Sequence, residues 1–439
     1  IALVYAILSG FWGVVVTDLV QFVIAMFGSI ALAIIALNYI GGMEVLLSKL
    51  NELLGSDIVT DNTLKFIPPI PDTGVATQTF WESPFSKFLI FISVMWWSHH
   101  GTDGGGYIIQ RMSSAKNERH ALLATLWFNI AHYALRVWPW IIVAVVSIVM
   151  FPIIPSEYSE LGVKAGYPLV MNTLLGPGLK GILIVSFLAA FMSTIDTHLN
   201  WGVSYLINDI YKRFFKPNET ERHYVLVGKI MTVILMILAA FTALKMQSIS
   251  KAWEFIFAMG AGIGLVLILR WFWWRVNAWS EITALATSIV ITISFEIIAY
   301  FQTINNNLEY SLFGSAPSIF GMSLQVHHKL MIIVPIAIIA WVTVTFFTEP
   351  EPMTKLETFY KRVQPGGWWA PVTSSFDHTL QPVTKGIFIL WLAGVMMIYG
   401  FTFGIGNLIF QNYSASVILF GFAGLGSYLI WNRNISKLT

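Results

Sequence analysis

Oxygen-bearing side chains interrupt an otherwise apolar stretch at residues 188–202, LAAFMSTIDTHLNWG. On a helix with about 3.6 residues per turn, one face of this stretch carries a stripe of small and polar residues: Ala190, Ser193, Thr194, Thr197 and Asn200. Asp196 lies at the edge of the stripe. A hydroxyl in a membrane helix often bonds back to a carbonyl one turn earlier, but a carboxylate only accepts hydrogen bonds. Hydroxyl, carbonyl and carboxylate oxygens together suit a hard cation, so the stripe with Asp196 predicts a sodium site.

A second acidic residue, Asp18, lies in the apolar stretch GVVVTDLVQF at residues 13–22. If the two helices pack together, Asp18 completes a cation cage with Ser193, Asp196 and Thr197. Two carboxylates that close repel each other unless a cation or a proton lies between them. The pair therefore predicts a bound sodium ion or a shared proton, and the residues alone leave both open.

A second cluster lies in VMWWSHHGTDGGGYIIQR at residues 94–111, where glycines and an aspartate weaken a membrane helix. A break at membrane depth is tolerated only where the backbone faces protein or a water-filled cavity, and such breaks mark transporter binding sites. Aromatic rings stack on sugars or cover cations, and His and Asp form directional hydrogen bonds. We predict that solute binds through these side chains: Trp96, Trp97, His99, His100 and Asp103. The alternatives are tryptophans at the outer interface and histidines that bond to neighbouring helices.

The amino-acid composition indicates whether these clusters lie in a water-soluble or a membrane protein. Hydrophobic residues make up 56% of the 439, charged residues make up 11%, and the mean hydropathy is +0.71, so the chain has too little polar surface for a water-soluble core. The 25 Lys and Arg nearly balance the 23 Asp and Glu, which excludes a basic nucleic-acid-binding surface. The absence of cysteine excludes disulfides and thiolate metal sites. The sequence predicts a protein whose partner is the lipid bilayer.

A hydrocarbon core of about 30 Å requires about 20 apolar residues per helix. This length predicts ten full spans, at residues 14–38, 84–110, 118–151, 178–208, 223–245, 252–275, 278–302, 328–347, 385–404 and 413–431. The expected fold is an all-α polytopic membrane protein with a single transmembrane domain over residues 1–439. The chain opens at Ile1 in apolar sequence, without an initiator Met or a signal peptide, so we interpret it as a fragment without its first core helices.

The loops between these spans alternate in charge. One set, which includes QRMSSAKNERH, YKRFFKPNETER and the tail WNRNISKLT, carries most of the Lys and Arg, and the other set is poor in them. The positive-inside rule places the basic set in the cytoplasm. We therefore expect a multi-pass protein of a cell membrane, the inner membrane in a bacterium, with the start of the chain and its C-terminus in the cytoplasm.

Four blocks of the chain resemble the sodium:solute symporter family, which includes sodium-coupled sugar, proline, pantothenate and sialic acid carriers. The block AAFMSTIDTHLNWGVSYLINDIYKRF resembles the family's signature helix, with a hydroxyl pair, an Asn and a DIYK-like ending. The blocks VVVTDLVQF, GYIIQRMSSAKNERHA and GAGIGLVLILRWFWWRVNAWSEI are similar to three further blocks in the family's order. Together they spread over most of residues 1–285. The resemblance implies two inverted five-helix repeats, of the leucine-transporter type, with residues 305–439 as peripheral C-terminal helices.

The resemblance also implies two sodium sites. The nearly universal site matches Ala190, Ser193 and Thr194, which the family completes with backbone carbonyls of a broken first core helix. A second site, present in some members, matches Asp18, Ser193, Asp196 and Thr197. Family members usually have a small or hydroxyl residue at the position of Asp196, so this carboxylate makes the second site stronger or proton-linked.

The resemblance bears on the solute as well. Tyr107 matches an aromatic residue that gates the inner side of the solute site in the family. The polar pair that often precedes this aromatic is replaced by Gly105 and Gly106, a departure from the family pattern.

The function expected from the sequence is sodium-coupled symport of a small polar organic solute, with a sugar or a sugar acid favoured. Proton-coupled symport and a transporter-like membrane sensor are the alternatives. We expect that the protein is not an enzyme, because the sequence has no motif that combines a nucleophile, a base and an orienting group. Beyond sodium as the coupling ion we expect no cofactor, and we expect no obligate protein partner.

Overall fold

The computed structural model describes residues 2–53, 65–71, 77–246, 249–306, 317–319, 321–374 and 384–432. The chain divides into two compact units. Unit 1 comprises Ile1–Leu64, Arg111–Ala240 and Leu390–Thr439, and unit 2 comprises Lys65–Gln110 and Phe241–Ile389. In the described part of the chain, every regular element is a helix except one two-stranded antiparallel sheet in unit 2. The assignment of residues 1–439 to a single transporter domain stays a prediction.

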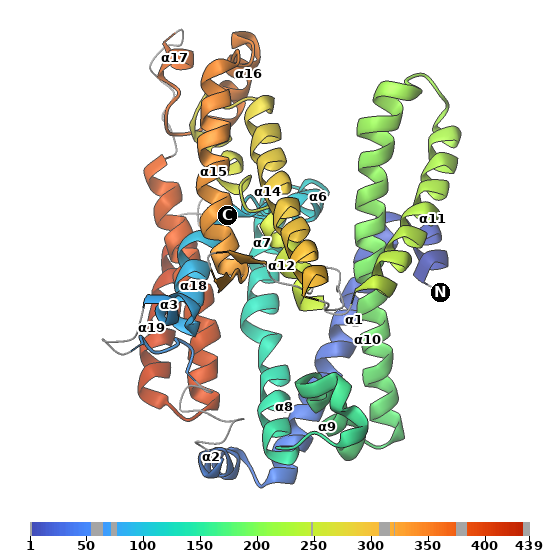
Figure 1. The fold of residues 1–439 in the computed structure, drawn as a ribbon, viewed down its shortest axis with the longest axis vertical. Coiled ribbons are helices and arrows are strands. Elements are labelled where there is room, and N and C mark those ends of the chain that lie inside the picture. The colour runs from blue at the N-terminus through green and yellow to red at the C-terminus, as the bar shows by residue number, and fades with distance from the viewer. Residues whose placement is uncertain are drawn as a thin grey trace. The chain divides into compact units, whose positions relative to one another are not determined.

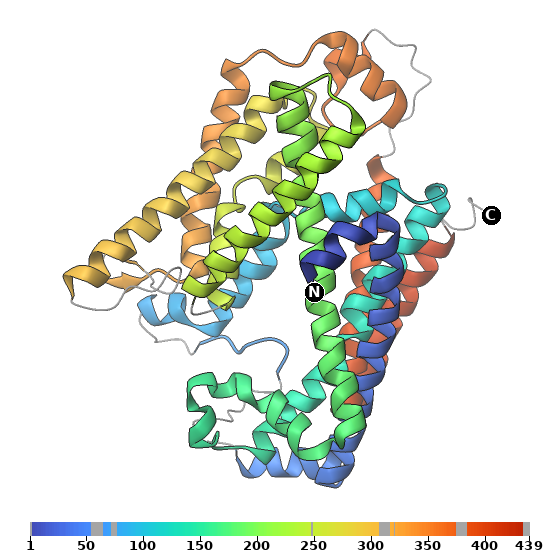
Figure 2. The same cartoon turned by 90° about the vertical axis from the view of Figure 1, so that its right-hand side faces the viewer.

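Unit 1 is built around a long pair of helices, α1 and α10, which pack side by side along their length (Figures 1 and 2). Helix α8 packs against α1, and the buried side chains of all three helices form one apolar cluster around Leu32, Val143 and Leu183. The elements that lie wholly or mostly in unit 1 are α1 (Ala2–Ile40), α2 (Met43–Glu52), α7 (Glu118–Asn129), η2 (Ile130–Leu135), α8 (Val137–Met150), η3 (Ser156–Ala165), α9 (Gly166–Leu174), α10 (Pro177–Ser204), η4 (Tyr205–Phe215), α11 (Glu221–Lys245), α18 (Thr384–Ile409) and α19 (Tyr413–Ile430).

Unit 2 is built around the pair α14 and α15, which lie side by side (Figures 1 and 2), with α12 packed against both. Helix α14 begins with a capping box in which Asn277 and Ser280 satisfy each other's backbone N–H groups. The elements of this unit are α3 (Thr77–Glu82), α4 (Pro84–Ile90), η1 (Phe91–Met95), α5 (Trp96–Ser98), α6 (Gly105–Ser113), α12 (Ile249–Met259), α13 (Gly264–Phe272), α14 (Ala278–Asn305), β1 (Ser318–Ile319), β2 (Met322–Ser323), α15 (Val326–Phe347), α16 (Met353–Val363) and α17 (Ala370–Thr373). Helix α6 ends in unit 1, because the boundary falls between Gln110 and Arg111.

Nine helices in the described residues are long and apolar enough to cross a membrane. They are Val15–Ile40, Glu118–Met150, Pro177–Phe215, Glu221–Leu244, Ile249–Phe272, Ala278–Asn305, Val326–Phe347, Phe388–Ile409 and Tyr413–Ile430. Each corresponds to one predicted span, so the prediction of an all-α polytopic membrane protein is confirmed.

The remaining predicted span, residues 84–110, is not a continuous helix. Its first part is formed by α4, η1 and α5, and the helix ends at Ser98 because His99 is extended, with φ −89° and ψ 165°. Gly104 and Gly105 have φ of +99° and +70°, a backbone region that glycine adopts without steric cost. The predicted break is therefore confirmed and lies at residues 99–104.

A second break separates α12 from α13 at residues 260–263, within the sequence GAGIG. Helix α13 contacts α5, and an added Cβ at Gly264 would overlap the backbone carbonyls of Trp97 and Ser98. An added Cβ at Gly260 would lie 2.5 Å from Nδ1 of His100. Gly264 thus lets α13 pack against the backbone at the end of α5, and Gly260 leaves room for the His100 side chain.

Candidate functional site

The packing of α1 against α10 brings Asp18 to the polar stripe. Gly28 of α1 permits the close approach, since a Cβ at this position would lie 2.9 Å from Cδ2 of Leu183. The Ser193 hydroxyl donates a hydrogen bond to Oδ1 of Asp18. The condition for the proposed cage, that these two helices pack together, is met, and the carboxylate lies against Ser193, one of the residues grouped with it from the sequence.

The structure adds an arginine to this cluster. Nη2 of Arg111 lies 3.4 Å from Oδ2 of Asp18 and 3.5 Å from Oγ1 of Thr197. The side chains of this ion pair are 32% and 29% exposed, respectively, so solvent screens the pair only in part. Three of the four residues predicted for the second sodium site, Asp18, Ser193 and Thr197, are therefore joined in one network.

Asp196 is fully buried, and its Oδ1 accepts a hydrogen bond of 2.8 Å from Nδ2 of Asn200. Asn200 lies one turn further along α10 and gives the carboxylate a hydrogen-bond donor on its own helix. A carboxylate buried in a membrane helix requires such donors, because its desolvation is costly.

Ala190 and Thr194 lie on an exposed part of α10. The Thr194 hydroxyl donates a 2.9 Å hydrogen bond to the Ala190 carbonyl, the local bond that serves as the alternative to ion binding for a single hydroxyl. The two oxygens are nevertheless adjacent on one face, so a cation could accept both as ligands if the hydroxyl proton turned away.

The residues predicted to bind solute gather around the two breaks of unit 2. The His99 ring meets the rings of His100 and Phe257 edge to face, at centroid distances of 5.7 and 6.3 Å. Trp253, one turn before Phe257 on α12, extends this aromatic cluster with a centroid distance of 5.5 Å. Nδ1 of His99 accepts the Gly101 N–H at 2.9 Å, which fixes the ring across the break.

The two predicted tryptophans differ in their surroundings. Nε1 of Trp97 donates to the Ser93 carbonyl at 2.7 Å, and the ring packs against the apolar cluster of α12, α14 and α15. Trp96 is 50% exposed. The side chain of Tyr107 lies outside the described part of the structure.

Asp103 makes protein contacts through both of its carboxylate oxygens. Oδ1 accepts the Gly105 N–H at 3.1 Å, and Oδ2 forms a 2.8 Å ion pair with Nη2 of Arg270. Nη1 of the same guanidinium lies 3.1 Å from Glu281. Arg270 of α13 and Glu281 of α14 thus anchor the break to two helices of unit 2.

Arg111, Arg270, Trp253 and Phe257 are not among the site residues predicted from the sequence. Arg111 and Arg270 both lie within blocks that were singled out, YIIQR and LVLILRWFWW, and each lies next to apolar residues. An arginine in such a position implies a carboxylate partner, and that signal was present.

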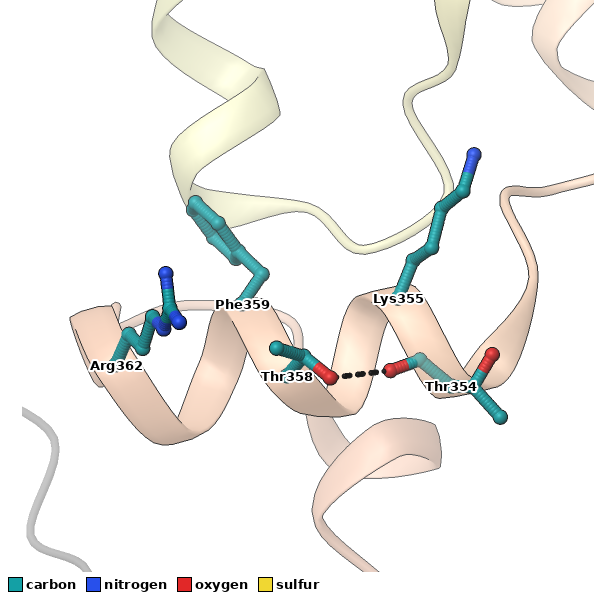
Figure 3. A pocket seen from close by; sticks show the side chains of 5 residues that line it. All are labelled: Thr354, Lys355, Thr358, Phe359 and Arg362. Atoms are coloured by element: carbon teal, nitrogen blue, oxygen red, sulfur yellow. Dashed lines mark hydrogen bonds between the residues drawn. The ribbon is translucent and has the colours of Figure 1, made fainter.

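A shallow hollow of about 450 Å³ lies on α16, lined by Thr354, Lys355, Thr358, Phe359 and Arg362. Figure 3 shows that these side chains all come from one helix, with the Thr358 hydroxyl bonded to the Thr354 carbonyl. None of the predicted site residues contributes to it.

The apolar helices are those of a multi-pass membrane protein, and its interrupted segments are of the kind that line binding sites in transporters. The profile of the sodium:solute symporter family matches residues 1–290. The chain belongs to this family.

Several curated relatives share weak but extended similarity with the chain. The sodium/mannose cotransporter of Bos taurus is 25% identical over 299 residues, which cover 63% of this chain and 49% of the relative. The sodium/glucose cotransporter 1 of Oryctolagus cuniculus is 25% identical over 376 residues, or 79% of this chain and 55% of the relative. The osmoregulated proline transporter of Bacillus subtilis is 23% identical over 309 residues, which cover 67% of this chain and 56% of the relative. The chain spans about half the length of the curated relatives it matches.

Proposed function

We propose that the intact protein is a sodium-coupled symporter that carries a small polar organic solute across a cell membrane by alternating access. Membership of the sodium:solute symporter family supports the coupling ion, and the names of the relatives support a sugar or a related compound. The observation that carries the proposal is the hydrogen bond between Ser193 of α10 and Asp18 of α1. It joins a carboxylate to the hydroxyl stripe at the interface of two membrane helices.

Two ion sites follow from these residues. The first uses the Ala190 carbonyl with the hydroxyls of Ser193 and Thr194. The second uses the oxygens of Asp18, Ser193, Asp196 and Thr197. In support, the oxygens of Ala190 and Thr194 are adjacent, and Asp18, Ser193 and Thr197 belong to one network.

A sodium ion that links α10 to another helix stabilises one conformation over the others. Coupling then requires that ion and solute both bind this conformation preferentially. Each charge that moves inward releases about 2.3 kcal/mol per 100 mV of membrane potential, so a second ion steepens accumulation of the solute.

The solute site comprises the side chains around the breaks of unit 2: Trp96, Trp97, His99, His100, Asp103 and Tyr107. Stacking of aromatic rings on a sugar ring and hydrogen bonds from imidazoles to hydroxyls fit a polyhydroxylated compound. The Trp253–Phe257 face of α12, which meets His99, adds apolar surface to this site.

The orientation follows the positive-inside rule, with the C-terminus in the cytoplasm. The protein acts without a cofactor, and its partners are sodium, the solute and the lipid bilayer, without an obligate protein partner.

Uptake by the intact protein in proteoliposomes tests the proposal, with sodium and pH gradients imposed separately and a panel of labelled sugars, sugar acids and amino acids. We expect accumulation with a sodium gradient alone. Accumulation with only a proton gradient would make the protein a proton-coupled symporter, and binding of solute without transport would make it a sensor. Ser193→Ala and Thr194→Ala should raise the sodium concentration that gives half-maximal uptake, whereas Ser427→Ala, which removes a hydroxyl bonded to a carbonyl of α19, should not.

A further inference from the structure

Arg111 places a positive charge among the oxygens assigned to the second ion site. One nitrogen, Nη2, lies 3.4 Å from Asp18 and 3.5 Å from Thr197. Asp18 uses its other oxygen to accept the Ser193 hydroxyl. The nitrogen therefore occupies the space between a carboxylate and a hydroxyl that a bound cation would share.

These contacts are weaker than those of a fixed structural ion pair. Charge-assisted N–H···O bonds have distances of about 2.7–2.9 Å, and both contacts of Nη2 exceed this range. The two side chains of the Asp18–Arg111 pair also remain about one third exposed, at 29% and 32%. A long, partly solvated ion pair gives up its partner at low free-energy cost.

We propose that Arg111 is a tethered cation that competes with sodium for the second site. When sodium is absent, the guanidinium balances the Asp18 carboxylate and keeps α1 and α10 together. When sodium binds Asp18, Ser193 and Thr197, the arginine leaves. The inference rests on the proposed sodium-coupled function. It adds that the Arg111 side chain controls the affinity of the second site for sodium.

Replacement of the Arg111 guanidinium by sodium would also affect the helix that carries Arg111. Arg111 lies in α6, the short helix that directly follows the break at residues 99–104. Release of its guanidinium removes the contacts of this helix with Asp18 of α1 and Thr197 of α10. Occupancy of the ion site is thereby transmitted along one helix to the segment that carries the predicted solute residues.

Sodium binding to the intact protein in detergent tests the competition, with ²²Na⁺ as the probe and choline replacing sodium at constant ionic strength. Arg111→Gln should lower the sodium concentration for half-saturation about three- to tenfold, because the competing charge is gone. Arg111→Lys keeps the charge and should stay near the unaltered protein. Arg119→Gln removes an exposed arginine of the following helix and serves as the control.

An unchanged or weaker sodium affinity in Arg111→Gln would overturn the inference, because a merely structural arginine lowers stability on removal without strengthening ion binding. Hydrogen exchange in the unaltered protein gives a test that needs no variant. Sodium should accelerate exchange of the amides of residues 105–113, and an unchanged or slower exchange at saturating sodium would contradict the release of Arg111. If the unaltered protein binds no sodium at all, the proposed function fails before this inference is reached.

Discussion

In the described part of the chain, Arg270 and Arg111 both form ion pairs with carboxylates, and the two arginines differ in the geometry of these pairs. Arg270 of unit 2 reaches Asp103 at 2.8 Å and Glu281 at 3.1 Å. Arg111 of unit 1 reaches Asp18 only at 3.4 Å. The first guanidinium has two carboxylates at hydrogen-bond distance, whereas the described contacts of the second are one carboxylate and one hydroxyl at longer range.

We call the ion pairs of Arg270 with Asp103 and Glu281 a fixed joint, because the protein itself satisfies these charges. The ion pair of Arg111 with Asp18 is, by contrast, one that we expect to exchange with a bound ion. The Asp103 side chain is 15% exposed, and its second oxygen accepts a backbone N–H, so the carboxylate is satisfied by the protein itself. The Asp18 carboxylate accepts the Ser193 hydroxyl and lies 3.4 Å from the Arg111 guanidinium, and in our proposal an ion replaces this guanidinium. Sites that bind and release ligands are expected in regions of low local stability. The ion pairs of Arg270 instead fix the conformation of the helix break at residues 99–104.

The fixed character of unit 2 is tested most strongly at Gly264. A Cβ here would overlap the carbonyls of Trp97 and Ser98, so Gly264→Ala should force the two broken segments apart. We expect a loss of about 3 kcal/mol, at the upper end for overpacking. Thermal unfolding of the purified intact protein, followed by tryptophan fluorescence, measures it.

Gly394→Ala provides the matched control, because a Cβ at this helical position meets nothing within 4 Å. It should leave stability unchanged or raise it by about 0.5–1 kcal/mol. Equal effects of the two substitutions would show that the breaks are not closely packed.

Asp103→Asn tests the ion pair directly. The amide retains an acceptor for the Gly105 N–H but loses the charge that attracts Arg270. Since Arg270 is 34% exposed, screening reduces the expected loss to about 1–2 kcal/mol of stability. The measurement is thermal unfolding together with solute binding.

The same variant decides between two roles of Asp103. A lower unfolding temperature with unchanged solute affinity assigns the residue to the joint. An unchanged unfolding temperature with lost solute binding would instead assign it to the solute site. Glu281→Gln, which removes the 3.1 Å arm of the joint, is the control and should cost less than Asp103→Asn.

Much of the fold follows from sequence, for a simple physical reason. The bilayer requires long apolar segments, so their length predicts the spans, and glycines in the sequence HHGTDGGG predict where one of them breaks. The cation cage of Asp18 with Ser193, Asp196 and Thr197 requires that α1 pack against α10, and a carboxylate in hydrocarbon favours such a partner on a neighbouring helix.

The side-chain pairing within the clusters could not be inferred in this way. Asp103 was assigned to solute because its chemistry suits hydrogen bonding, yet Arg270, 167 positions further along the chain, lies at 2.8 Å from it. Which acid pairs with which base depends on how the helices rotate and approach each other, and the spacing of residues along the chain does not specify this. The roles of the sodium and solute residues stay predictions for the same reason.

The exchangeable character of the unit 1 cluster is tested by Asp18→Asn. The variant keeps an acceptor for the Ser193 hydroxyl but removes the charge that attracts a cation. We expect the half-saturating sodium concentration to rise at least about tenfold, or about 1.4 kcal/mol in binding, with a smaller effect on stability. Radioactive sodium binding at constant ionic strength measures it.

Asp209→Asn controls for the loss of one negative charge, because Asp209 is an exposed residue of η4 in the same unit. Sodium binding that responds equally to both substitutions would indicate a general charge effect. Binding that responds to neither would remove Asp18 from the ion site.

Asp196→Asn is expected to have the smallest effect on sodium binding. It tests whether the buried Asp196 carboxylate contributes to the same ion site as Asp18. The new amide oxygen can still accept the hydrogen bond from Asn200, so the variant should fold with an unfolding temperature close to that of the unaltered protein. Loss of the negative charge should weaken sodium binding by about threefold, less than Asp18→Asn, because the Asp196 carboxylate is also stabilised by a donor on its own helix. An unchanged sodium affinity would make Asp196 a structural acid, comparable to Asp103 in unit 2, and would leave Asp18 as the carboxylate that attracts the ion.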